Sequence, residues 1–92
     1  MTTHVAAREL IITGRVQGVA FRWTCQLEAE RRGVAGWVTN EPDGSVRAWF
    51  EGPPADVQAM HDWCLTGPSG ARVTRVDGVD RTPTGLTGFA VR

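Results

Sequence analysis

The sequence has 92 residues, ten basic and ten acidic side chains, and 41% hydrophobic residues. This composition is typical of a globular protein, and the length predicts a single domain over residues 1–92, because a second core would need roughly 50 residues of its own. The formal net charge of zero provides no global field for nucleic acid or anionic membranes, so we expect neither partner. Without a membrane-length apolar run or a signal-peptide pattern, the chain is expected to be cytoplasmic, and we expect a monomer.

All ten basic residues are arginines, and the absence of lysine excludes Schiff-base catalysis and a lysine-containing phosphate loop of the Walker type. The two cysteines, Cys25 and Cys64, are too few for a zinc site. We expect them to be buried free thiols, although a disulfide between two adjacent helices remains the alternative.

The first half of the chain predicts a strand, a glycine loop and a helix. Residues 8–13 have the β-branched and apolar content of a strand that ends at Gly14, and residues 21–32 form a helix closed by Gly33. Phe21, Cys25 and Ala29 share one helical flank. Trp23 and Leu27 form a second flank, and the sequence leaves open which of the two is more deeply buried.

The second half predicts a hairpin, a second helix and two further strands. Residues 34–40 and 45–51 are strands separated by a Glu-Pro-Asp-Gly turn at 41–44, and in the second strand Arg47, Trp49 and Glu51 alternate with apolar residues toward a wetter face. A helix from the Gly-Pro-Pro at 52–54 to about residue 65, a strand at 71–77 and a short strand at 88–92 follow. The β-α-β-β-α-β order predicts a ferredoxin-like α+β sandwich, an antiparallel sheet with two helices on one face.

The segment Gly-Arg-Val-Gln-Gly-Val-Ala-Phe-Arg, residues 14–22, joins the first strand to the first helix. Main-chain N–H groups at a helix start lack partners and carry partial positive charge, and a glycine such as Gly18 lets successive N–H groups curl around one anion. Arg22 would add a permanent two-pronged cation. Spacing alone equally allows an ordinary glycine loop in which Arg22 only begins a solvated helix.

This segment closely resembles the signature loop of the acylphosphatase family. Gly-Trp-Val-Thr-Asn at 36–40, followed by Asp-Gly-Ser-Val at 43–46, resembles the second signature of that family. The resemblance extends from the first strand to the end of the chain. It implies hydrolysis of acyl phosphates, with Arg22 and Asn40 as the catalytic pair and a phosphate-binding loop formed by Val16, Gln17, Gly18, Val19, Ala20 and Phe21.

In such an enzyme the arginine binds the phosphoryl group and the asparagine carboxamide orients the attacking water. Asparagine is not a base at neutral pH. The reaction does not need a strong general base, because the carboxylate of an acyl phosphate is already a good leaving group. The resemblance therefore implies a reaction with no cofactor and no metal, on a small-molecule acyl phosphate. Which acyl phosphate is physiological is left open.

Other functions are weighed against this one. A non-catalytic ferredoxin-like module that binds phosphate ligands needs the fold but not Asn40, and a regulatory domain of a larger carbamoyl-transfer protein is a further alternative. RNA binding is disfavoured because the third strand lacks a basic and aromatic signature. Compared with the family pattern, Thr24, Arg32 and Arg47 are unusual, and we predict modest stability.

Several chemically interesting side chains are predicted to have structural roles. His61 lies within the second helix and His4 near the N-terminus, and neither is expected to be catalytic. Asp43, beside Glu41, fits turn chemistry better than metal binding. The four tryptophans are expected to be core or half-buried residues, with only Trp49 on the wetter strand face; the others are Trp23, Trp37 and Trp63.

Overall fold

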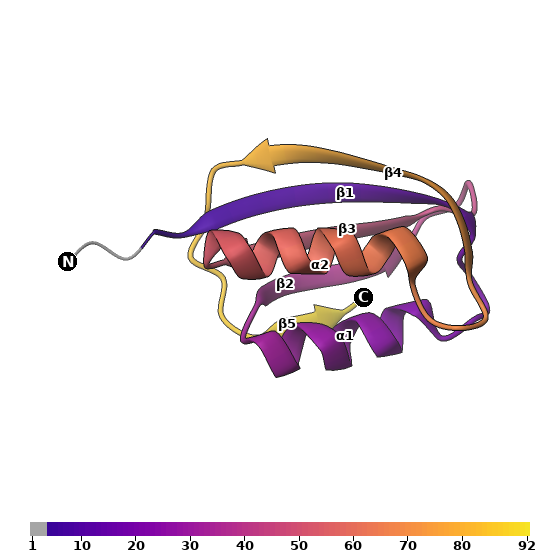
Figure 1. The fold of residues 1–92 in the computed structure, drawn as a ribbon, viewed down its shortest axis with the longest axis horizontal. Coiled ribbons are helices and arrows are strands. Elements are labelled where there is room, and N and C mark those ends of the chain that lie inside the picture. Colours follow the sequence, from indigo (N-terminus) through magenta and orange to yellow (C-terminus); the bar gives the residue numbers. More distant parts are fainter. Residues whose placement is uncertain (1–3) are drawn as a thin grey trace.

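The computed structural model describes residues 4–92 and consists of two helices packed on one face of a five-stranded sheet (Figure 1). The elements in chain order are β1 (Ala6–Arg15), α1 (Phe21–Arg32), β2 (Ala35–Asn40), β3 (Val46–Gly52), α2 (Pro54–Thr66), β4 (Arg72–Arg81) and β5 (Phe89–Val91). The predicted ferredoxin-like α+β sandwich is confirmed. Neither helix is long and apolar enough to cross a membrane, as far as residues 4–92 are concerned.

The strand order is β4-β1-β3-β2-β5, and one pairing departs from the expected antiparallel sheet. β5 runs parallel to β2, with Phe89 opposite Gly36, because the chain crosses from the β4 edge to the opposite edge before it enters the sheet. β4 is also longer than expected and continues to Arg81, since the ten-residue β1 offers it partners as far as Ala7. These pairings connect distant parts of the chain, so local sequence does not reveal them.

The hydrophobic core lies between the sheet and one flank of each helix. In α1 this flank is formed by Phe21, Cys25 and Ala29, and α2 contributes Val57, Met60 and Cys64. The question left open for α1 is thereby answered, because Trp23 and Leu27 on the other flank are 62% and 48% exposed. Trp23 is therefore neither a core nor a half-buried residue.

Cys25 and Cys64 are free thiols, and both are buried. Burial, reinforced by the neighbouring Glu28 carboxylate, raises the pKa of the Cys25 thiol, and burial together with the nearby Cys25 raises that of Cys64. Both sulfurs thus pack as small neutral groups, which are poor nucleophiles.

The face of the sheet opposite the helices carries paired charges and aromatic rings. Arg47 donates to Glu9 at 3.0 Å and to Glu41 at 3.1 Å. The rings of Trp37 and Trp49 stack with centroids 6.4 Å apart, so the expectation that only Trp49 occupies this face is wrong. The unusual Arg47 therefore has a structural explanation as the centre of an ion-pair cluster.

Glu51 also belongs to the wetter face by its alternation, but it is only 3% exposed. The segment between β4 and β5 covers it, and its carboxylate accepts hydrogen bonds from the main-chain N–H groups of Thr84, Gly85 and Leu86 at 2.7–3.0 Å. Trp49 Nε1 donates to it at 3.0 Å. Burial alone would raise the pKa of Glu51, but these donors reverse that effect and lower it to about 2.

Gly36 lies where three strands meet. Its φ of 142° is unfavourable for other residues, and a Cβ atom added there would lie 1.7 Å from the main-chain oxygen of Trp49. The Gly36 N–H donates to the main-chain oxygen of Gly88 at 3.0 Å. Only glycine therefore permits β2 to approach β3 this closely.

Candidate active site

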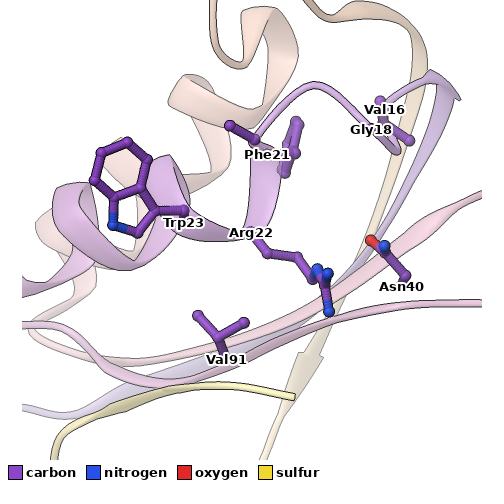
Figure 2. A pocket seen from close by; sticks show the side chains of 8 residues that line it. Val16, Gly18, Phe21, Arg22, Trp23, Asn40 and Val91 are labelled. Atoms are coloured by element: carbon purple, nitrogen blue, oxygen red, sulfur yellow. The ribbon is translucent and has the colours of Figure 1, made fainter.

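A pocket of about 200 Å³ opens where the loop after β1 meets the ends of β2 and β5 (Figure 2). A cavity of this size can hold a small molecule. Arg22 is the one charged side chain among its lining residues, which are Val16, Gly18, Ala20, Phe21, Arg22, Trp23, Asn40 and Val91. The pocket thus brings the loop and Arg22, which are contiguous in the sequence, together with Asn40 of the next strand.

The loop backbone is left-handed at two positions, with φ of 74° at Gly18 and 59° at Ala20. Changes of backbone handedness within a short segment form concavities whose N–H groups suit anions. Among the hydrogen bonds of residues 4–92, none uses a main-chain N–H of residues 17–22 as donor. The first turn of α1 adds its partial positive charge at the same place. The main-chain N–H groups of the loop are therefore available to an anion, and no side chain at Ala20 caps the helix and competes for them.

Two hydrophobic side chains anchor this loop in the core. Val16 and Phe21 are 1% and 2% exposed, and the Phe21 ring packs edge-on against Trp63 with centroids 5.3 Å apart. Val19 is half-buried and packs against the same core. These residues of the predicted phosphate loop hold the backbone in place with their side chains. Val16 and Phe21 also line the pocket, whereas Val19 and Gln17 do not.

Gln17 connects the loop to the β2–β3 hairpin. Its Nε2 donates to the main-chain oxygens of Glu41 at 2.7 Å and Ser45 at 2.9 Å. The turn itself is closed by Asp43, whose Oδ1 accepts from the Ser45 N–H at 2.9 Å and from the Ser45 hydroxyl at 2.6 Å, as the turn chemistry predicts. Those two bonds lower the pKa of Asp43. Gln17 thereby fixes the loop relative to the end of β2.

Arg22 lies in the first turn of α1, and its side chain is half-buried. Its Nη1 donates to the main-chain oxygen of Arg92 at 2.9 Å. One turn further along α1, Gln26 Nε2 donates to the main-chain oxygen of Phe89 at 3.1 Å. The helix therefore holds β5 against the pocket, and the fork of Arg22 keeps most of its N–H groups available, since Arg92 uses one of them.

Asn40 is the last residue of β2 and lies on the helix-facing side of the sheet, opposite Val46. Figure 2 shows the Arg22 side chain extending toward its carboxamide. Within residues 4–92, the Asn40 carboxamide makes no hydrogen bond. It is half-buried, so its carbonyl oxygen and amide group are available to a water molecule or a ligand in the pocket.

Sequence reasoning missed Trp23 and Val91 as pocket residues. Trp23 directly follows Arg22, and its position off the apolar stripe of α1 was a signal that its ring faces outward. Val91 gave no such signal, because it reaches the pocket only through the parallel pairing of β5 with β2.

The histidines lie away from the pocket. His61 packs at the sheet, where its Nδ1 is 3.1 Å from Arg8 Nη1, and His4 is exposed outside the helices and strands. No group of three or more His, Cys, Asp or Glu side chains suitable for a metal occurs in the described part of the chain.

Comparisons with known proteins identify the family to which this chain belongs. The acylphosphatase family profile matches residues 8–91. An acylphosphatase of Nocardioides sp. is 53% identical over 95% of this chain and 88% of its own length; one of Thermococcus kodakarensis is 54% identical over 89% and 90%. The crystal structure of acylphosphatase from Bacillus subtilis superposes with a TM-score of 0.91, at 35% identity and coverage of 95% of this chain and 98% of that one. The chain belongs to the acylphosphatase family.

Proposed function

We infer that this protein is an acylphosphatase, which hydrolyses acyl phosphates to a carboxylate and inorganic phosphate. Membership of the family over residues 8–91 supports this activity. One observation supports placing the reaction in this pocket. Main-chain N–H groups that make no other hydrogen bond within residues 4–92 border the same small cavity as Arg22 and Asn40. A non-catalytic binding module is not favoured, because proteins of about 50% identity over most of the chain are acylphosphatases.

We propose that the phosphoryl group binds in the loop of residues 16–21 and is held from the side by Arg22. The guanidinium stays protonated and matches two phosphoryl oxygens at once, while the main-chain N–H groups of the loop complete the binding. Charge that develops on the equatorial oxygens in the transition state would be stabilised by the same donors, without any rearrangement.

Asn40 has the geometry to orient the nucleophile. We propose that its carboxamide positions a water molecule, whose oxygen forms the new bond to phosphorus while the bond from phosphorus to the bridging oxygen breaks. The electron pair of that bond leaves with the carboxylate, and the proton of the water passes to a phosphoryl oxygen or to solvent. No side chain has to act as a strong base, which agrees with the choice of asparagine.

The remaining parts of the proposal concern the whole protein. We propose that residues 1–92 act as one domain and as a monomer in the cytoplasm, without nucleic acid as partner. We further propose that hydrolysis requires neither metal nor cofactor, because Arg22 and the loop can together balance the phosphoryl charge.

The test measures phosphate release from benzoyl phosphate in the presence of EDTA, with inorganic phosphate as a competitive inhibitor. Activity that persists in EDTA and that phosphate inhibits is the expected result. Activity that needs added Mg²⁺ would overturn the metal-free mechanism, and an absence of hydrolysis with and without metal would overturn the proposed activity itself.

A further inference from the structure

Trp23 is the largest exposed hydrophobic side chain of the described residues, and its 62% exposure has no packing explanation. It is part of α1, whose core flank is formed by Phe21, Cys25 and Ala29, so the ring is not needed to attach the helix to the sheet. Yet it borders the pocket beside Arg22. An exposed aromatic side chain at the edge of a pocket is placed to contact a ligand that binds there.

The pocket lining differs on the two sides of Arg22. Figure 2 shows Gly18 and Asn40, together with Val16, on one side of Arg22 and the apolar side chains of Trp23 and Val91 on the other. Val91 is 41% exposed and is fixed there by the pairing of β5 with β2 and by the bond from the Arg92 N–H to the main-chain oxygen of Val38 at 2.9 Å. The apolar side is therefore built from one rigid helix and one paired strand.

An acyl phosphate has the same division into a charged phosphoryl end and an organic acyl end. If the phosphoryl group lies at Arg22 and the loop, the acyl group extends away from them, and the side of the pocket bordered by Trp23 and Val91 offers it exposed apolar surface. We propose that Trp23, supported by Val91, is the binding surface for the acyl group and favours flat, aromatic acyl groups over short ones. This inference rests on the proposed function and adds the substrate class to it.

The energetic basis is the contact between an aromatic acyl ring and the indole. Offset or edge-on aromatic contacts contribute beyond simple burial, and the ligand would also remove indole surface from water. An acetyl group is too small to gain much of either contribution. Trp23 therefore determines specificity, which is measured as the ratio of kcat/KM for aromatic acyl phosphates to kcat/KM for short ones.

The chain provides a matched control in Leu27. It lies one turn after Trp23 on the same flank of α1 and is 48% exposed, but it does not line the pocket. Truncation of either side chain removes exposed apolar surface from the same helix, so general effects on α1 should be shared by the two variants.

The experiment compares kcat/KM for benzoyl phosphate and acetyl phosphate in the parent, Trp23→Ala, Trp23→Phe and Leu27→Ala. We expect Trp23→Ala to lower the benzoyl-to-acetyl ratio by about five- to twentyfold, Trp23→Phe to retain most of the ratio, and Leu27→Ala to keep the parent ratio. An unchanged ratio in Trp23→Ala, or an equal fall in Leu27→Ala, would overturn the proposal.

A second measurement separates binding from chemistry. Phenacylphosphonate and acetonylphosphonate carry a CH₂ group in place of the bridging oxygen and cannot be hydrolysed at that position. Their inhibition constants should show the same loss of aromatic preference in Trp23→Ala, and equal weakening of both would count against the acyl surface. A parent protein that hydrolyses neither acyl phosphate would instead refute the proposed function, so the two failures are distinguishable.

Discussion

Gln17 Nε2 donates a 2.7 Å hydrogen bond to the main-chain oxygen of Glu41, the residue that follows Asn40. This bond joins the proposed phosphate-binding loop to the strand end that carries the proposed water-orienting group. One carboxamide, which also reaches the main-chain oxygen of Ser45, therefore adds a direct connection between the two halves of the site to the strand pairing that joins them through the sheet.

Replacement of this carboxamide by Gln17→Ala should separate the two halves of the site. We expect kcat to fall by about tenfold or more, because small misplacements of reacting groups are costly, while the inhibition constant of phosphate changes much less. The loss of two hydrogen bonds should also lower the free energy of unfolding by roughly 1–2 kcal/mol. Gln58→Ala on α2, which removes a glutamine remote from the pocket, is the control; a parallel loss of kcat and phosphate affinity in Gln17→Ala would contradict a positioning role.

Arg22→Lys should nearly abolish turnover. A lysine ammonium is a point charge that cannot hold two phosphoryl oxygens with a planar fork, so kcat/KM should fall by at least about 100-fold. Phosphate inhibition should weaken as well, which steady-state kinetics on benzoyl phosphate would measure. Arg31→Lys, at the exposed end of α1 where the guanidinium pairs with Glu28, should leave both quantities near the parent values, and retained turnover in Arg22→Lys would exclude the forked contact.

Asn40→Ala tests the water-orienting role by a different signature. Because the carboxamide is proposed to contact water rather than the phosphoryl group, kcat should fall by about 100-fold while the inhibition constant of phosphate stays within a few-fold of the parent. Asn40→Asp keeps the shape but adds a negative charge, so it should also weaken phosphate binding. A kcat for Asn40→Ala comparable to that of the parent would refute the role.

The covered carboxylate of Glu51 predicts a pH dependence of stability. Its pKa is lowered from 4.5 to about 2 in the folded state, so its stabilising contribution is complete above about pH 4.5 and is lost as the pH falls toward 2. Glu51→Gln should lower the free energy of unfolding at pH 7 by roughly 2 kcal/mol and flatten its decrease between pH 5 and pH 2. Urea unfolding across this range is the measurement, with the exposed Glu30→Gln as control; identical slopes in parent and Glu51→Gln would contradict the assignment.

The left-handed backbone of Ala20 predicts an unusual response to glycine. An ordinary L-residue in this conformation costs roughly 1–2 kcal/mol, which glycine avoids, while glycine adds unfolded-state entropy of roughly 0.4–1 kcal/mol. Ala20→Gly should therefore be neutral or slightly stabilising in urea unfolding, and Ala20→Val should be destabilising. Ala59, in the interior of α2, is the control, because Ala59→Gly should cost at least about 0.5–1 kcal/mol; equal losses at both sites would show that Ala20 is unstrained.

The features that the sequence predicted are those that depend on neighbouring residues. The apolar spacing of Phe21, Cys25 and Ala29 defines the buried flank of α1, and the turn that Asp43 closes is readable in its residue types. Even two of the residues that depart from the family pattern are explained locally, since the Thr24 hydroxyl donates to the main-chain oxygen of Ala20 at 2.6 Å and Arg32 pairs with Glu28 at 3.2 Å.

The features that were missed depend on contacts across the chain. Glu51 alternates like a surface residue, and only the segment 33–35 residues later buries it. Val91 reaches the pocket through a parallel strand pair that no local signal encodes. Of the site, Arg22, Asn40 and the loop could be named in advance because their motifs are contiguous, whereas the apolar side of the pocket required the folded chain.

Gly36 has a consequence for how mutational scans of this protein should be interpreted. Any larger residue would force the hairpin partner away from β2, and Asn40 lies four residues further along that strand, roughly 13 Å away. A scan that scores activity would thus rank Gly36 alongside the chemically active positions, although it never meets substrate. Sensitivity at that position would reflect the close pairing of β2 with β3, and only an independent measure of folding would distinguish it from participation in hydrolysis.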